Sequence, residues 1–395
     1  MQPDSSSAFD SPAAPTGSGL RAFREAALLL ILALAALLVL DGLVFRIGPY
    51  KKLLEPDSTA GQFELVLRRE QEAQREYGDN LVATFGDSRM SYYPREAAKV
   101  EPQTGYYLRQ AGLAGTNARV WYYMLRDLDP TASRYRAIVL AVNDFDDEDQ
   151  AYQDADDLRV VHYAAAHLRL SDIPELVLSF PSWTSRWEAL RSALLKGYAY
   201  QADIQEFLDN PPKRRAYVQL ANGGYPHWTW DFVDSTKTLE GLAIDWSTFK
   251  VTFPPNATPD QIDTITNFLA RRPAPQTGAM AAFRRHWMGK IIDRYRNSRT
   301  KVIFIRLPRG AVVRPDNLVK KQSATIRDFA RLPNVLLANE HAFEELEHPE
   351  LFKDGLHMND KGNTRFSVLL SQEVARLLGP PAPNWQALPD HPRDK

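Results

Sequence analysis

The sequence predicts an α/β fold in which a parallel sheet carries helices on both faces, preceded by one N-terminal transmembrane helix. Two observations predict it. Short apolar runs alternate along the chain with helical patterns, as in proteins built on a parallel sheet. Residues 26–45 also form an apolar stretch that is long enough to cross a bilayer. The predicted strands are Leu81–Phe85, Thr104–Tyr107, Ala137–Val142, Lys301–Leu307 and Asn334–Ala338.

The chain begins with a head and an anchor. Residues 1–25 are predicted to be a disordered head, because Met1–Leu20 is rich in Ser, Pro, Ala and Gly. The stretch 26–45 carries a single charge, Asp41, and as a helix its uncharged part would be about 30 Å long. A cleaved signal peptide has a shorter apolar region, and a core helix of a soluble protein is usually apolar on one face. We therefore predict an uncleaved transmembrane signal anchor.

Charge and composition limit the location and the partners. Basic residues flank the anchor on both sides, so they do not decide its orientation. A short head followed by an exported domain is the commoner arrangement, which would hold the domain 46–395 on the inner (cytoplasmic) membrane, in the periplasm or outside the cell. The net charge of -1 gives no reason to expect nucleic acid. The absence of cysteine excludes disulfides and cysteine nucleophiles.

The first strand ends in the most informative motif. A helical pattern over Phe63–Tyr77 leads into Leu81–Phe85, which stops abruptly at Gly86-Asp87-Ser88. Ligands and catalytic groups collect at the carboxyl edge of an open parallel sheet, so this strand delivers a serine to that edge. The later helices are predicted over Thr116–Leu128, Ala279–Asn297, Thr325–Arg331 and Lys361–Leu378, and the Pro-rich tail 379–395 is predicted to be loose.

The regular alternation breaks between residues 145 and 299. This stretch is too long for a loop and holds most of the tryptophans, so we predict a largely helical insertion around the mouth of the site. Trp228 and Trp230 are interleaved with polar residues and could stack on sugar rings. The alternative is that the tryptophans fill a small core of the insertion.

A serine hydroxyl is a poor nucleophile unless a base lies within hydrogen-bond reach and a third group orients that base. The segment Asp354-Gly355-Leu356-His357 supplies both, since Asp354 can meet one imidazole nitrogen while the other faces outward. The developing oxyanion needs donors. The candidates are the backbone N–H groups of Ser88 and Gly115 and the side-chain amide of Asn143. Judged alone, each of these segments could equally be an ordinary turn or helix cap.

Together the four segments resemble the SGNH (GDSL-like) hydrolase superfamily, whose blocks match Gly86-Asp87-Ser88, Gly115, Asn143 and Asp354-Gly355-Leu356-His357. The resemblance covers about 80–145 and 300–378. It implies a three-layer α/β/α flavodoxin-like sheet, with Ser88 as nucleophile, His357 as base, Asp354 as its orienter, and Ser88, Gly115 and Asn143 as the oxyanion hole. Two positions depart from the pattern: Ala141 replaces a glycine, and Arg89 replaces the leucine of the motif.

An anchor joined to such a domain also resembles the membrane-anchored SGNH proteins that work with membrane-bound O-acyltransferases (MBOAT proteins) to acylate cell-surface polymers. This resemblance implies an enzyme, an O-acyltransferase or esterase that transfers or removes O-acetyl groups on a polysaccharide or other glycan of the cell envelope, with an MBOAT-type protein as membrane partner. It implies no cofactor. Arg89 could meet an anionic substrate or form a surface salt bridge.

Two other functions stay open. The chain could be a non-catalytic binding or assembly subunit that keeps the SGNH fold, although the full set of catalytic residue types argues against this. A metal-assisted hydrolase could use Asp87, Asp144, Asp146, Asp147 and His357. An acidic helix start explains the run 143–149 more simply, so no metal is expected.

Overall fold

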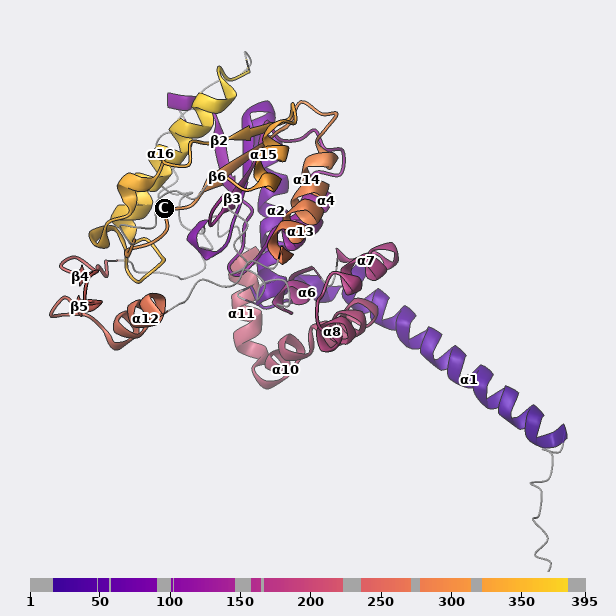
Figure 1. Cartoon of the computed structure of the whole chain (residues 1–395). Coiled ribbons are helices and arrows are strands. Elements are labelled where there is room, and N and C mark those ends of the chain that lie inside the picture. Colours follow the sequence, from indigo (N-terminus) through magenta and orange to yellow (C-terminus); the bar gives the residue numbers. More distant parts are fainter. Residues whose placement is uncertain are drawn as a thin grey trace, which may run out of the picture.

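The computed structural model describes residues 17–47, 49–56, 58–90, 101, 103–145, 158–164, 167–222, 236–270, 278–313 and 322–382. A five-stranded, fully parallel sheet lies at its centre (Figure 1). Its order is β2-β1-β3-β6-β7, so the direction in which strands are added reverses between β1 and β3. The predicted α/β class with a parallel sheet is confirmed. The strands are β1 (Leu81–Phe85), β2 (Tyr107–Gln110), β3 (Ala137–Val142), β6 (Lys301–Arg306) and β7 (Val335–Leu337).

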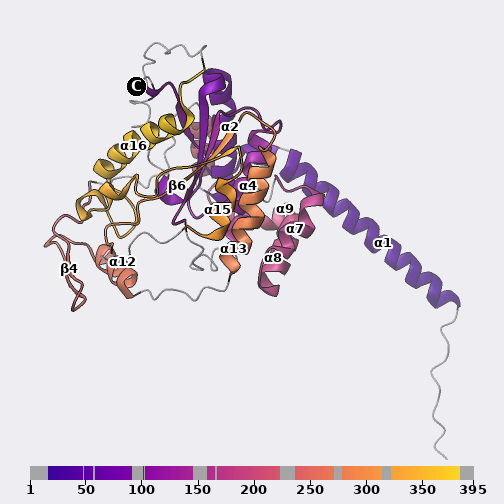
Figure 2. The same cartoon turned by 45° about the horizontal axis from the view of Figure 1, so that its top comes forward.

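Helices cover both faces of the sheet because its strands are apolar on both sides. Along β3, Ile138, Leu140 and Val142 enter one core cluster, while the alternate residues enter another. Figures 1 and 2 show one long helix on one side of the sheet and the remaining sheet-packing helices on the other. The single helix is α16 (Asp360–Leu378), and the others are α2 (Thr59–Tyr77), α4 (Ala118–Leu128), α14 (Gly289–Arg294) and α15 (Ala324–Ala330).

Side-chain caps fix where the main helices begin. The Ser58 hydroxyl accepts from Gly61 N at the start of α2, Asn117 accepts from Arg119 N before α4, and Asn359 accepts from Gly362 N before α16. The strand predicted over Thr104–Tyr107 was misplaced, because β2 begins at Tyr107. As an edge strand, β2 can include the half-buried polar residues Arg109 and Gln110, which end an apolar pattern without ending the strand.

Helix α1, which contains the predicted anchor, runs from Gly17 to Gly42 and continues as a π-helical turn, Leu43–Ile47. It is long and apolar enough to span a membrane. The helix begins earlier than predicted, so residues 17–25 of the expected disordered head belong to it. Arg21 and Glu25 form an ion pair one turn apart and continue the helix beyond the apolar stretch. Residues 1–16 lie outside the described residues.

The segment that follows the anchor is held against the insertion. Asp41 accepts hydrogen bonds from the backbone N–H groups of Lys196 and Gly197, both at 2.7 Å. Asp203 accepts from the Tyr50 hydroxyl at 2.5 Å and from the Glu55 N–H at 3.0 Å. The buried Arg214 guanidinium joins this cluster by donating to Asp203 and to the Leu53 carbonyl. The anchor therefore enters the domain through a packed, hydrogen-bonded segment.

The insertion 145–299 is largely helical, as expected, and has two parts. One part is a set of short helices beside the anchor, and the other packs near α16 and includes a two-stranded antiparallel hairpin that was not predicted. The first part comprises α6 (Arg159–Ala164), α7 (Ile173–Leu178), α8 (Trp183–Leu194), α9 (Lys196–Ala199), α10 (Gln201–Asp209) and α11 (Pro211–Asn222). The second comprises β4 (Ala243–Asp245), β5 (Lys250–Thr252) and α12 (Pro259–Ala270), and the chain then returns through α13 (Ala279–Phe283) to α14.

The start of the tail that was predicted to be loose is tied to the domain. The Tyr106 hydroxyl donates to the carbonyl of Gly379 at 2.9 Å, and the Ala382 N–H donates to Asn80 at 2.9 Å. Residues 383–395 lie outside the described residues.

Candidate active site

Ser88 lies directly beyond β1, at the carboxyl end of a central strand. Gly86 separates the strand from a single 3-10 turn, Ser88–Met90. A side chain at Gly86 would collide with Met90 and would press on Ala141, so this turn needs glycine. The strand order reverses between β1 and β3, and such a switch point opens a crevice at the carboxyl edge of a parallel sheet.

His357 and Asp354 come to this serine from the far end of the chain. The Ser88 Oγ lies 2.8 Å from His357 Nε2, and His357 Nδ1 lies 2.9 Å from Asp354 Oδ2. All three side chains are half-buried, and that of His357 is 26% exposed, so a substrate can reach the imidazole. The structure thus brings together the three residues expected to act as nucleophile, base and orienter.

The loop before α16 shapes the Asp354–His357 pair. Asp354 Oδ1 accepts from the backbone N–H groups of Leu356 and His357, both at 2.8 Å. Burial alone would raise the pKa of Asp354, but the hydrogen bonds and charge of His357 and these backbone donors lower it below its ordinary value. An ionised Asp354 accepts a hydrogen bond from the protonated Nδ1 of His357. The unprotonated Nε2 then accepts a hydrogen bond from the Ser88 hydroxyl.

Gly115 occupies the loop between β2 and α4. Its φ of 67° is left-handed, a conformation that glycine adopts without strain. The Tyr163 hydroxyl of α6 donates to the carbonyl of Ala114 at 2.7 Å. Because a trans peptide directs its carbonyl and its N–H to opposite sides, this bond turns the Gly115 N–H away from Tyr163. Tyr163 therefore supports the candidate oxyanion donor. The sequence pattern did not indicate this role for Tyr163.

Thr116 ties the same loop to the serine turn. Its hydroxyl lies 2.6 Å from the Leu113 carbonyl and 3.2 Å from the Gly86 carbonyl, and it accepts from the indole N–H of Trp121 at 2.9 Å. Gly112 approaches the backbone of Gly86 so closely that a side chain there would overlap it. The loop and the serine turn therefore hold each other in position.

Asn143 follows β3 and is exposed, and its side chain contacts Arg89. Arg89 donates to Asn143 Oδ1 and forms a two-pronged ion pair with Asp87, at 3.0 and 2.6 Å. Because the Asn143 oxygen faces Arg89, its NH₂ group is left as the donor that points elsewhere. Arg89 is only 9% exposed, which fits the salt-bridge role that the sequence left open for it.

Asp87 remains charged beside this serine. Burial would raise its pKa, but the Arg89 guanidinium and its hydrogen bonds lower the pKa below the ordinary value, and the charge of His357 contributes further. The role of Asp87, the aspartate of the Gly-Asp-Ser motif, is therefore to hold the Arg89 side chain in place.

The second part of the insertion packs against the loop that carries Asp354 and His357. Gln261 of α12 donates to the Lys353 carbonyl at 2.7 Å, and Leu239 donates to the Phe352 carbonyl at 3.0 Å. On the other side, Ala311 donates to the Gly355 carbonyl at 3.2 Å. The residues next to Asp354 are therefore held by segments that lie between 44 and 113 positions earlier in the sequence, none of which carries a recognisable motif.

The other predicted site residues cannot be placed. Trp228 and Trp230, expected to stack on sugars, lie outside the described residues, as do Asp146 and Asp147 of the metal alternative. Within the described part of the chain, no group of three or more His, Asp or Glu side chains is arranged to hold a metal ion.

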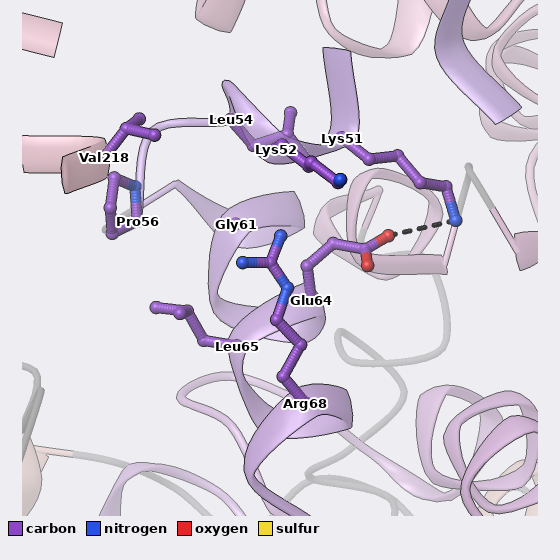
Figure 3. Close-up of a pocket in the computed structure, with 9 residues that line it drawn as sticks. All are labelled: Lys51, Lys52, Leu54, Pro56, Gly61, Glu64, Leu65, Arg68 and Val218. Carbon is purple, nitrogen blue, oxygen red and sulfur yellow. Dashed lines mark ion pairs between the residues drawn. The ribbon is translucent and has the colours of Figure 1, made fainter. Parts of the chain in front are cut away.

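A pocket in another part of the domain lies between α2, α11 and the segment after the anchor (Figure 3). It is lined by three basic side chains, those of Lys51, Lys52 and Arg68, and Glu64 pairs with Lys51 at 3.2 Å. None of its residues belongs to the Ser88 site.

The chain matches no protein-family model, and no curated protein matches it either. The geometry around Ser88 therefore carries the assignment of function.

Proposed function

We propose that this chain is a serine-dependent O-acyltransferase or esterase that works through an acyl-Ser88 intermediate. The observation that carries the proposal is the unbroken line of hydrogen-bond contacts from Ser88 Oγ through His357 to Asp354. A base within reach of the serine and a carboxylate behind the base are what nucleophilic catalysis by a hydroxyl requires.

The chemistry follows from these contacts. Ser88 Oγ attacks the carbonyl carbon of an ester while its proton moves to His357 Nε2. Asp354 remains ionised and stabilises the imidazolium through Nδ1. The oxyanion of the tetrahedral intermediate is stabilised by the Ser88 and Gly115 N–H groups and the Asn143 amide. The intermediate breaks down to acyl-Ser88, and His357 protonates the departing alcohol. A sugar hydroxyl or water then repeats the steps in reverse to release the acyl group.

The arrangement of the site supports an SGNH-type enzyme. Counted along the sequence, the strands of the sheet are ordered 2-1-3-4-5, which is the flavodoxin-like order. Ser88, Gly115 and Asn143 follow the first, second and third strands, and the Asp354–His357 loop comes after the fifth. A non-catalytic subunit with this fold would have no need of a base in contact with the serine.

The predicted anchor supports a location and a class of substrate. A helix able to span a membrane supports an enzyme held on the inner membrane with its domain outside the cytoplasm. There it would act on O-acyl groups, of which O-acetyl is the simplest, of a polysaccharide or other envelope glycan. An MBOAT-type membrane protein is the acyl donor proposed for the transferase. Neither step calls for a cofactor.

The test uses the full chain in detergent micelles, exposed to a fluorophosphonate probe and to an activated acetyl ester. We expect covalent labelling of the wild type and none of the Ser88→Ala variant. Ser247→Ala, in the exposed β4–β5 turn, is the control and should label like the wild type. A well-folded wild type that resists both reagents would favour the binding subunit, or an enzyme that needs its partner, over an independent esterase.

A further inference from the structure

Exposed apolar side chains gather in one part of the domain. Beyond residue 47, eight large apolar side chains of the described residues are exposed, and seven of them lie between Leu170 and Leu220. A soluble surface usually scatters such side chains singly, and a local concentration marks a contact with another phase or molecule. The seven are Leu170, Leu178, Trp183, Trp187, Leu194, Leu208 and Leu220.

Helix α8 shows the pattern most clearly. Trp183, Trp187 and Leu194 are 78%, 53% and 39% exposed, and their spacings of four and seven residues place them on one face of the helix. The opposite face is buried through small side chains, among them Ala189 and Ala193. The helix therefore packs on the domain by its small residues and presents its bulky apolar residues outward.

This surface adjoins the anchor. Helix α8 ends at Leu194, and the backbone of Lys196 and Gly197 holds Asp41 at the end of the apolar stretch. Both views of the molecule show α7 and α8 beside the end of α1 that joins the domain (Figures 1 and 2). The C-terminal end of α8 therefore lies close to the point where the apolar stretch of the anchor ends.

We propose that α7 and α8 rest in the headgroup interface of the membrane that holds the anchor. Tryptophan is the residue enriched at that depth, and helices with one bulky apolar face lie in the plane of the interface. The Arg191 guanidinium lies 6.0 Å from the Trp187 ring and 4.6 Å from the Tyr198 ring, which gives this face a charged border. The proposal rests on the proposed anchor and not on the chemistry of Ser88.

The basic side chains of the neighbouring segment suit the same surroundings. Lys51 and Lys52 follow the anchor within a few residues, and with Arg68 they line the pocket of Figure 3. Basic groups close to a membrane surface are attracted to anionic headgroups. A bilayer accounts for both the apolar face and this charge, whereas a protein partner would need to match several separate helices.

The absence of cysteine gives a direct test, because one introduced cysteine can carry one spin label. The full chain is placed in lipid nanodiscs with a nitroxide at Leu178→Cys, Trp183→Cys or Trp187→Cys. Leu34→Cys in the anchor marks the lipid, and Phe249→Cys, exposed in the β4–β5 turn, marks the water. Collision rates with oxygen, which prefers lipid, and with a nickel chelate, which stays in water, are then measured for each label.

We expect the α7 and α8 labels to show oxygen collision rates above, and nickel collision rates below, those of Phe249→Cys, with values between that label and Leu34→Cys. Labels at all three positions that meet nickel as often as Phe249→Cys would overturn the proposal, even with Leu34→Cys in lipid. A water-exposed Leu34→Cys would overturn both the anchor and this surface. The serine probe, measured on the same samples, reports separately on the proposed function.

Discussion

The orientation of the His357 imidazole depends on the two carboxylate oxygens of Asp354. One carboxylate oxygen accepts from two backbone N–H groups of its own loop, and the other faces His357 Nδ1 at 2.9 Å. The loop thereby sets the direction of the carboxylate, and the carboxylate sets the direction of the imidazole. A spacing of three positions lets one short loop hold both side chains.

Replacing Asp354 with Asn should therefore disturb the base without unfolding the loop. The Asn oxygen can still accept from the backbone, but its NH₂ group would face Nδ1 and favour the wrong imidazole tautomer. We expect the rate of Ser88 labelling to fall roughly a thousandfold to ten-thousandfold. Labelling kinetics with the fluorophosphonate probe measure this, and a fall of less than about tenfold would remove Asp354 from the catalytic set.

Arg89 is a positioning residue in this geometry, since it holds Asp87 and Asn143 together. In an Arg89→Leu variant, Asn143 loses the bond that orients its amide. Loss of one oxyanion donor costs roughly a hundredfold to a thousandfold in kcat, so misorientation should cost up to about a hundredfold. The loss should appear in kcat for the acetyl ester, with KM little changed.

Arg89→Lys is the matched variant, because it keeps the charge without the planar fork. It should recover less than half of the lost activity on a logarithmic scale. A rise in KM alone for either variant would instead indicate that Arg89 binds the substrate directly.

At the scale of elements, the close approach of two glycines joins the β2–α4 loop to the serine turn. Adding a methyl group in Gly112→Ala would overlap the Gly86 backbone, which cannot move without displacing Ser88. We expect a loss of about 1–3 kcal/mol in the free energy of unfolding, together with slower serine labelling. Chemical denaturation of the full chain in detergent measures the first effect.

Gly289→Ala is the control for that substitution. The glycine begins α14 with helical backbone angles, and the nearest atom to an added methyl group is 4.0 Å away, on Phe329. Alanine there should stabilise the chain by about 0.5–1 kcal/mol. Equal effects at the two glycines would show that the contact between Gly112 and Gly86 has no structural role.

Two of the glutamates on helix α2, Glu64 and Glu70, have pKa values shifted in opposite directions. Burial raises the pKa of Glu70 to about 7, while Arg109 and the Tyr135 hydroxyl only partly counter it. A pKa raised on folding means that the folded chain loses stability as the pH rises from the ordinary value toward 7. In Glu70→Gln this loss is absent, so the variant should gain about 2 kcal/mol over the wild type between a pH of about 5.5 and about 8.

Glu64 gives the opposite sign. Burial would raise its pKa, but the hydrogen bond and charge of His167, together with Lys51, lower it. Its contribution to stability is therefore present above its ordinary pKa and is lost as the pH falls through the lowered value. Glu64→Gln should destabilise the chain at neutral pH and approach the wild type in acid. Thermal unfolding of both variants across this pH range would expose a wrong assignment of either sign.

At the scale of the whole molecule, local sequence patterns predict the parallel sheet and the meeting of Ser88, His357 and Asp354. Parallel strands end at a common edge, so Ser88, Gly115 and Asn143 could be expected to meet there from local patterns alone. The Asp354–His357 unit could be recognised because both residues sit in one short loop. The predicted strand over Thr104–Tyr107 stopped short of the end of β2, because the polar Arg109 and Gln110 of this edge strand resemble a turn.

Contacts between distant segments left no local pattern to interpret. The Tyr163–Ala114 bond joins residues 49 positions apart, and the Asp203–Tyr50 bond joins residues 153 positions apart. A tyrosine and an aspartate are common on helices, and only the fold shows which of them meet. For the same reason, the two-part division of the insertion became visible only in three dimensions.

The way in which the anchor joins the domain has a mechanical consequence. Asp41 is hydrogen-bonded to α9, and Tyr50, Glu55 and Arg214 converge on Asp203, so the described residues that follow the anchor are held against the domain. With the anchor in a bilayer, Ser88 of the proposed enzyme would lie at a constant height above the membrane surface. A long polymer would be modified only along the stretch that passes at that height. Its spacing from the lipid, and not only its chemistry, would then decide which hydroxyl groups are modified.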